Sequence, residues 1–200
     1  MPPALPHHAR MPPRDPTASS TAPLPVRYGH ADTPLGTVLL SGRGGRLTGL
    51  HFTGHRRSPR TGPAWVRDEA AFDGVRRQLN EYFAGRRTRF DLPLALGGTP
   101  FELSVWTALQ GIPYGATASY GDIAHSLGRP GAGRAVGGAN GRNPISIVVP
   151  CHRVIGADGG LTGYGWGVDR KAWLLDHERR GAHPPRTGPR IRTASALIPG

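Results

Sequence analysis

Cys151 and His152 are adjacent residues whose side chains together could perform nucleophilic chemistry. The thiolate is the reactive form of cysteine, and an ordinary thiol with a pKa of about 8.5 is only a few per cent ionised at neutral pH. His152 is the nearest base in the sequence, and a carboxylate is expected to orient its imidazole. The spacing leaves Asp169, Asp176 and Glu178 open as that carboxylate.

The two side chains are not expected to contact each other directly. Residues 145–149, just before Cys151, are apolar and rich in β-branched side chains, which favours a buried strand or extended segment. Neighbouring side chains of an extended chain point to opposite sides, so a water is expected to bridge Cys151 and His152. For an isolated Cys-His pair, a buried cysteine beside an exposed histidine is the commoner arrangement.

Composition excludes several classes of protein. Cys151 is the only cysteine among 200 residues, which rules out an intramolecular disulfide and a multi-cysteine zinc or iron–sulfur site. No segment approaches the roughly 20 apolar residues of a membrane span, and residues 1–10 lack the apolar run of a signal peptide. We therefore expect a cytoplasmic protein that does not enter the membrane.

The charge balance favours a polyanionic partner. The formal net charge is +12, and Arg-rich surfaces gain affinity for nucleic acid by displacing condensed counterions. Residues 25–97 carry twelve Arg against six acidic residues, whereas residues 98–182 carry eight Arg and Lys against six. High Arg, Ala, Gly and Pro content can also reflect genome base composition, so charge alone does not establish nucleic-acid binding.

Residues 25–97 are predicted to form a small N-terminal α/β domain. Short alternating runs separated by turn sequences indicate an antiparallel sheet, with strands over 28–33, 37–41 and 47–53. Apolar residues at helical spacing predict a helix over 68–84.

Residues 98–182 are predicted to form a second, mostly helical domain. Thr99 and Glu102 have the spacing of a capping box, with a proline at the first helical position between them. Ser119 begins another short helix, and Asp122 stands three residues later. Both patterns place a helix start at a defined residue.

A helix-turn-helix motif is a candidate within this second domain. The helix over 119–128 is followed by the tight turn 129–131 and by a helical pattern over 132–140. Gly137 and Gly138 disfavour that second helix. Taken alone, the pattern fits an ordinary pair of packed helices better.

The remaining segments complete the organisation of the chain. A Gly-rich loop covers residues 156–167, and a last helix is predicted over 169–180. Residues 1–24 and 183–200 lack a periodic apolar pattern and are predicted to be disordered tails.

Three stretches of sequence resemble one known family. Residues 143–154, Asn-Pro-Ile-Ser-Ile-Val-Val-Pro-Cys-His-Arg-Val, together with Gly163-Tyr164 and the ending Lys-Ala-Trp-Leu-Leu-Asp-His-Glu over 171–178, closely resemble the O6-alkylguanine-DNA alkyltransferases, also called methylated-DNA–protein-cysteine methyltransferases. The resemblance extends over about 99–181 and more loosely over 26–97. It implies an α/β (α+β) fold, in which a small ribonuclease-H-like α/β domain precedes a mostly helical domain with a helix-turn-helix.

The resemblance also implies an activity. These proteins flip an O6-alkylguanine out of double-stranded DNA and transfer its alkyl group irreversibly to a cysteine, which here would be Cys151. His152 would be the base, acting through a water, and Glu178 would orient it. Asn143 would tie the recognition helix to the cysteine loop, and Tyr120 would lie beside the target phosphate and protonate the departing guanine.

Further matching positions concern DNA and the base pocket. Arg134 would enter the duplex and take the place of the extruded nucleotide, while Ala132 and Ala135 would allow a close approach in the minor groove. The base pocket would include Tyr164 and backbone groups of Val154 and Gly165.

Trp166 departs from the family pattern, because a small residue, commonly glycine, usually occupies its position beside the pocket loop. We expect Trp166 to narrow or reshape the base pocket for larger alkyl groups. Acceptance of O4-alkylthymine stays open.

The resemblance implies a monomer that needs no metal and no cofactor, because the DNA carries the group that is transferred. It would act once, on nucleoid DNA in the cytoplasm.

Two alternative functions stay open. A non-catalytic, alkyltransferase-like lesion sensor typically lacks the acceptor cysteine, whereas Cys151 is present. A Cys-His hydrolase would turn over many times and would require an oxyanion hole.

Overall fold

The computed structural model of the chain describes residues 24–161 and 163–182. The two predicted disordered tails therefore lie outside the described residues, apart from Leu24. Within the described part, no helix combines the length and the apolar character that crossing a membrane requires.

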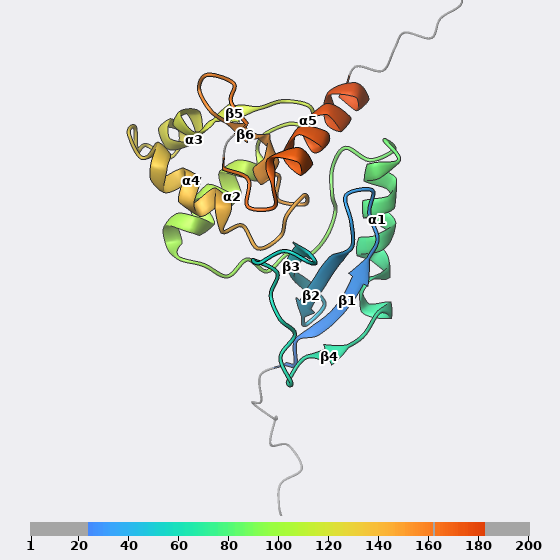
Figure 1. Ribbon diagram of the computed structural model, residues 1–200. Coiled ribbons are helices and arrows are strands. Elements are labelled where there is room, and N and C mark those ends of the chain that lie inside the picture. The colour runs from blue at the N-terminus through green and yellow to red at the C-terminus, as the bar shows by residue number, and fades with distance from the viewer. Residues whose placement is uncertain (1–23, 162, 183–200) are drawn as a thin grey trace, which may run out of the picture.

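The N-terminal part of the chain is built around a four-stranded sheet (Figure 1). The strands are β1 (Arg27–Ala31), β2 (Val38–Arg43), β3 (Arg46–Phe52) and the short β4 (Val66–Arg67). Their order is β3-β2-β1-β4, with antiparallel pairing of β1 with β2 and of β2 with β3, and parallel pairing of β4 with β1. The prediction of three antiparallel strands is confirmed. The strand β4 was not predicted, because its two residues are too few to show an alternating pattern.

A helix packs against this sheet. The short 3₁₀ turn η1 (Ala70–Phe72) leads into α1 (Asp73–Phe83), which runs alongside the strands (Figure 1). Val75, Leu79 and Tyr82 are buried on one side of α1, as their spacing predicts. Their burial stabilises the contact between the helix and the sheet.

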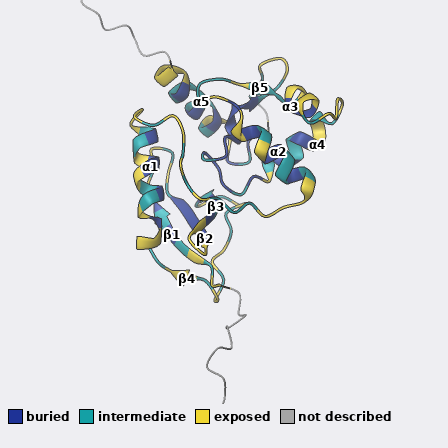
Figure 2. Ribbon diagram, turned by 180° about the vertical axis from the view of Figure 1, so that it is seen from behind, coloured by how far each residue is buried: buried dark blue, intermediate teal, exposed yellow. Residues whose placement is uncertain are grey.

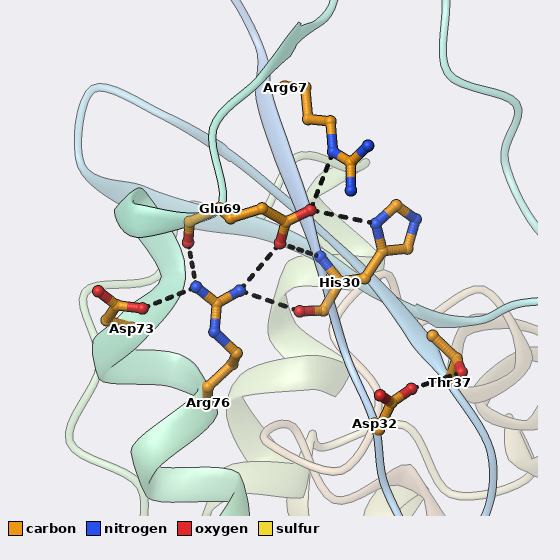
Figure 3. Close-up of polar contacts among 7 residues, drawn as sticks. All are labelled: His30, Asp32, Thr37, Arg67, Glu69, Asp73 and Arg76. Carbon is orange, nitrogen blue, oxygen red and sulfur yellow. Dashed lines mark hydrogen bonds and ion pairs between the residues drawn. The ribbon is translucent and has the colours of Figure 1, made fainter.

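Glu69 ties β1 to α1 (Figure 3). Its carboxylate accepts hydrogen bonds from the backbone N–H of His30 at 3.0 Å and from Arg76 Nη1 at 3.0 Å. The same Arg76 nitrogen donates to the carbonyl oxygen of His30 at 3.0 Å. The His30 N–H is the main cause that holds the pKa of Glu69 at about 2, so the carboxylate is ionised at neutral pH.

The C-terminal part is mostly helical, as predicted. Its helices are α2 (Pro100–Gln110), α3 (Tyr120–Ser126), α4 (Gly133–Gly141) and α5 (Val168–Ala182). Two very short parallel strands, β5 (Ala118–Ser119) and β6 (Val154–Ile155), and the 3₁₀ turn η2 (Cys151–Arg153) lie between them.

Both predicted capping boxes are present. The Thr99 hydroxyl accepts from the Glu102 N–H at 3.3 Å, and the Glu102 carboxylate accepts from the Thr99 N–H at 2.8 Å. Ser119 and Asp122 form the same reciprocal pair, at 3.0 and 2.8 Å. These local bonds satisfy N–H groups that a helix start otherwise leaves unpaired, which is why the sequence alone located the start of α2 and α3.

The helix-turn-helix pattern corresponds to α3 and α4, which lie side by side (Figure 1). The helix of 133–141 forms although Gly137 and Gly138 lower its intrinsic propensity. A Cβ atom on Gly137 would lie 3.7 Å from the Tyr120 ring, an ordinary packing distance, so α4 packs against the start of α3 at this point. Tertiary packing thus outweighs the unfavourable helix propensity of these glycines.

The edge of β3 holds the segment that leads to Cys151. The Leu50 N–H donates to the Pro144 carbonyl at 2.9 Å, and the Ser146 N–H donates to the Leu50 carbonyl at 3.1 Å. Most residues of β2 and β3 are buried, as is most of the segment between the sheet and the helices that leads to Cys151 (Figure 2). The N-terminal sheet therefore positions the cysteine loop directly.

Candidate active site

Residues 145–149 are buried, apart from the half-buried Val148, but the predicted strand or extended segment is wrong. The chain turns back on itself, with the Val149 N–H donating to the Ile145 carbonyl at 2.9 Å. Ile147 has a φ of 70°, in the left-handed region that β-branched residues rarely adopt. Asn143 closes the turn, because its Nδ2 donates to the Val149 carbonyl at 2.8 Å and its Oδ1 accepts from the Ile145 N–H at 3.0 Å.

Cys151 follows this turn and begins η2, with its side chain buried. Its carbonyl oxygen accepts a hydrogen bond from Asn140 Nδ2 at 3.2 Å. Asn140 lies on α4 and Asn143 lies two residues beyond its end, so two amides tie the end of α4 to the segment around Cys151. Asn140 was not predicted from the sequence, although it stands in the same polar stretch as Asn143.

The environment of the Cys151 thiol keeps it protonated. Burial raises the pKa of Cys151 to about 11, and this outweighs the lowering by hydrogen bonds from Asn143 and Ser146 and by the charge of Lys171. Burial also lowers the pKa of Lys171 to about 8. A thiol with this pKa is a poor nucleophile at neutral pH until a base removes its proton.

His152 is buried beside Glu178. Its Nε2 lies 2.9 Å from Glu178 Oε1 and must donate, because an ionised carboxylate only accepts. Burial lowers the pKa of His152, although Glu178 acts to raise it. His152 Nδ1 has no hydrogen-bond partner within the described part of the chain, and hence no bond to Cys151. The imidazole is thus a neutral base with its second nitrogen available.

Glu178 is the centre of a buried polar cluster. Its two oxygens accept from Arg153 Nε at 2.8 Å, Arg153 Nη2 at 2.9 Å, the Tyr82 hydroxyl at 2.8 Å and the Gly115 N–H at 3.1 Å. Burial raises the pKa of Glu178, but hydrogen bonds from His152 and Arg153 more than offset this and hold it below its ordinary value. Glu178 is therefore an anion at neutral pH.

This cluster shows which of the candidate carboxylates lies beside His152: it is Glu178. Asp176, two residues before Glu178 on α5, forms ion pairs with Arg179 and Arg180 at the surface instead. Arg153 was given no role from the sequence, although it stands in the string that carries the resemblance.

A hollow of about 340 Å³ lies between α4 and the loop that contains Tyr164, and Cys151 is not among its lining residues. Its lining residues are Arg57, Gly137, Gly138, Gly141, Arg142, Gly163, Tyr164 and Gly165. Tyr164 and Gly165 were predicted for the base pocket, whereas Val154 is buried in β6, where it pairs with Ala118, and does not line the hollow. Glycine is favoured at position 163, because its φ is 76° and a Cβ atom on it would lie 2.6 Å from the Tyr120 hydroxyl.

Trp166 lies between the sheet and the cysteine loop and does not line the hollow. Its ring packs against His51, Phe52 and His55, with ring centroids 5.5 to 5.9 Å apart. Its Nε1 donates to the Ser146 hydroxyl at 2.6 Å. In the structure Trp166 joins the N-terminal sheet to the segment before Cys151, whereas its place in the sequence predicted a position at the base pocket.

The other predicted DNA-facing residues lie on or beside α4. Arg134 and Ala135 are exposed, and Ala132 is the N-cap residue and half-buried. The opposite side of α4 is anchored to α2, since Trp106 Nε1 donates to the Ala139 carbonyl at 2.9 Å. The side of α4 that carries Arg134 is therefore open to a partner.

Among the described residues, no group of three or more His, Cys, Asp or Glu side chains could hold a metal ion.

Comparison with known proteins agrees with this geometry. A model described as the ribonuclease-like domain of 6-O-methylguanine DNA methyltransferase matches residues 26–96, and one described as its DNA binding domain matches residues 100–180. The methylated-DNA–protein-cysteine methyltransferase of Mycolicibacterium paratuberculosis is 55% identical over 161 residues, which cover 80% of this chain and 95% of that relative. The Mycobacterium tuberculosis protein of the same name is 53% identical over 154 residues, covering 77% and 93%.

Solved structures show the same likeness. The crystal structure of Mycobacterium tuberculosis OGT in complex with DNA superposes with a TM-score of 0.72 at 51% identity, covering 78% of this chain and 93% of that one. The crystal structure of the Mycobacterium tuberculosis O6-methylguanine methyltransferase gives a TM-score of 0.70 at 52% identity, covering 77% and 93%. The two matched domains and these relatives place the chain in the 6-O-methylguanine DNA methyltransferase family.

Proposed function

We propose that this protein repairs DNA by transferring the alkyl group of an O6-alkylguanine to Cys151, in a single irreversible turnover. The observation that carries the proposal is the buried Cys151 followed by a His152–Glu178 pair, in a chain of this family. The sulfur–carbon bond forms as the carbon–oxygen bond at O6 breaks, and the alkyl carbon stays on sulfur as a thioether. The thiol proton leaves to a base, and the guanine takes up a proton as it departs.

The proposed proton path uses the neutral imidazole. His152 Nδ1 would accept the Cys151 proton through a water, and Glu178 stabilises the imidazolium that results. Tyr120 would protonate the departing guanine. Burial first, and the neighbouring Cys151 second, raise the pKa of Tyr120, so its hydroxyl keeps its proton until the guanine leaves. Asn143 and Asn140 hold the cysteine loop against α4 and position the sulfur.

The proposed DNA mode follows from the exposed side of α4. The partner would be double-stranded DNA bound by a monomer, with α3 and α4 in the minor groove, Ala132 and Ala135 against the backbone and Arg134 in place of the extruded nucleotide. The flipped base would enter the hollow beside Tyr164 and Gly165. We also propose that the boundary between the two domains lies between residues 97 and 98. The protein would act in the cytoplasm, at the nucleoid, where its DNA substrate is.

Labelled duplex DNA separates this function from the two alternatives. With the label on the O6-methyl group, we expect label on the protein, at no more than one per molecule. Tight binding without labelling would support a lesion sensor. Many turnovers of an ester substrate at Cys151 would support a hydrolase.

Arg134→Ala tests the proposed base flipping. An inserted arginine offsets part of the stacking lost on extrusion, so its removal should slow transfer from duplex DNA about tenfold or more and affect transfer from the free base less. Single-turnover rates with both substrates measure this. Arg77→Ala, at an exposed arginine of α1, is the control for loss of charge alone. Equal slowing with both substrates would contradict base flipping by Arg134.

Trp166→Phe tests whether this residue joins the parts of the chain or shapes the pocket. The change keeps an aromatic ring but removes the N–H that Ser146 accepts, so it should lower the free energy of unfolding by about 1 kcal/mol. The ratio of benzyl to methyl transfer should stay as in the wild type. Urea unfolding and the two transfer rates measure this, with Trp65→Phe, a partly buried ring packed on Tyr28, as the control. A selective gain for the benzyl group would instead place Trp166 at the pocket.

A further inference from the structure

An arginine from the loop that follows the N-terminal sheet reaches the hollow that Tyr164 lines. Arg57 lies in the loop that follows β3, and its Nη1 donates to the Gly141 carbonyl, the last residue of α4, at 3.1 Å. The same nitrogen lies 2.8 Å from where a Cβ atom of Gly165 would be. Arg57 therefore lines the same hollow as Tyr164, although more than a hundred residues separate them in the sequence.

The loop that carries Arg57 is held by its own hydrogen bonds. Ser58 Oγ donates to the Phe52 carbonyl at 2.6 Å and accepts from the His55 N–H at 3.1 Å. The Arg57 N–H donates to His55 Nδ1 at 3.2 Å. The His55 ring packs edge-on against Trp166, with centroids 5.5 Å apart. The position of Arg57 at the hollow is thus fixed by packing on both parts of the chain.

The lining of the hollow suits an anion. Five of its eight lining residues are glycines, so a ligand can approach the backbone closely. Of the two arginines, Arg142 is paired with Glu102. None of the ion pairs among residues 24–161 and 163–182 involves Arg57. Its guanidinium is exposed and, beyond the bond to Gly141, has further N–H donors in a fork that matches a phosphate.

We propose that Arg57 binds a backbone phosphate of the damaged strand next to the extruded nucleotide, so that the N-terminal sheet takes part directly in lesion binding. This inference rests on the proposed function, because the phosphate belongs to the strand whose base would lie beside Tyr164. A phosphate fits better than a base edge, since the guanidinium is exposed at the rim of the hollow while Tyr164 is buried.

Arg57→Gln tests this proposal, because it removes the positive charge and keeps a polar side chain that can donate hydrogen bonds. We expect binding to duplex DNA to weaken about tenfold, as for the loss of one charge-assisted hydrogen bond. The slope of log K against log salt should fall in magnitude by about 0.9, the value for one phosphate contact. Single-turnover transfer from subsaturating duplex DNA should slow more than transfer from free O6-benzylguanine.

Two matched variants accompany it. Arg57→Lys keeps the charge, so it should retain the wild-type salt slope with only part of the lost affinity. Arg56→Gln removes the neighbouring exposed arginine and should change duplex binding by less than about twofold, since nonspecific attraction is shared among many cations. Unfolding curves of the variants check that each is folded.

The outcomes separate the two claims. An unchanged salt slope in Arg57→Gln, or equal slowing with duplex DNA and free base, would overturn the phosphate contact. An equal loss in Arg56→Gln would do the same, by showing general electrostatics. Failure of the wild-type protein to take up label from methylated duplex DNA would instead refute the proposed function.

Discussion

Cys151→Ala is expected to leave no measurable alkyl transfer while duplex DNA still binds. The chain has one cysteine, so no other thiol can accept the alkyl group. Binding should stay within about twofold of the wild type, because phosphate contacts dominate DNA affinity and the Cys151 side chain is buried. Transfer is measured with labelled O6-methylguanine duplex, and binding by fluorescence anisotropy with the same DNA.

Cys151→Ser provides the matched comparison. Its hydroxyl has nearly the shape of the thiol but is a much weaker nucleophile, so this variant should also transfer nothing. Normal binding together with lost transfer in both variants isolates the chemical step. Residual transfer in either variant would show that another side chain accepts the group.

Glu178→Ala is expected to have the largest effect on stability. The carboxylate is fully buried, and it is the counter-charge of Arg153, itself only 7% exposed. Removing one partner of a buried ion pair leaves an uncompensated charge, which costs about 3–5 kcal/mol in the free energy of unfolding. The Tyr82 hydroxyl and the Gly115 N–H would lose their acceptor as well. Urea unfolding at neutral pH measures the loss.

Asp176→Asn is the control on the same helix. Asp176 pairs with Arg179 and Arg180 at the surface, where ion pairs contribute about 0–1 kcal/mol. A similar loss of stability in both variants would contradict the buried cluster as the source of the effect.

Glu178 also gives the stability a defined dependence on pH. Its folded-state pKa lies below the ordinary value of 4.5, so the unfolded chain binds its proton first as the pH falls. The contribution of Glu178 is therefore fully present above about pH 4.5 and is lost progressively in more acidic solution. The free energy of unfolding of Glu178→Gln should therefore fall less steeply than that of the wild type as the pH is lowered below about 4.5.

Local patterns predicted the helix starts but not the turn before the cysteine. Thr99 and Ser119 satisfy their helices through bonds to residues three positions away, so nearby sequence contains the whole signal. Residues 145–149 have the composition of a strand, yet Asn143 and the edge of β3 fold them into a turn with Ile147 at a positive φ. The residue types of this segment therefore predicted that it is buried, whereas its backbone conformation depends on tertiary contacts.

The site shows the same division between local and tertiary information. Spacing alone left Asp169, Asp176 and Glu178 open, and the resemblance named Glu178. The packing of α5 against η2 brings the Glu178 carboxylate to His152 Nε2, whereas Asp176 pairs with Arg179 at the surface. Arg153 and Arg57 were missed because their partners, Glu178 and Gly141, lie 25 and 84 positions away. No spacing rule links residues over such separations.

Mass spectrometry of the intact protein after mixing with excess O6-methylguanine duplex DNA tests the central claim most directly. Each molecule is predicted to gain one methyl group, found on the peptide that contains Cys151, with no further gain as more DNA is added. An unmodified protein, a methyl group on another residue, or continued consumption of methylated DNA without modification of Cys151 would contradict the account.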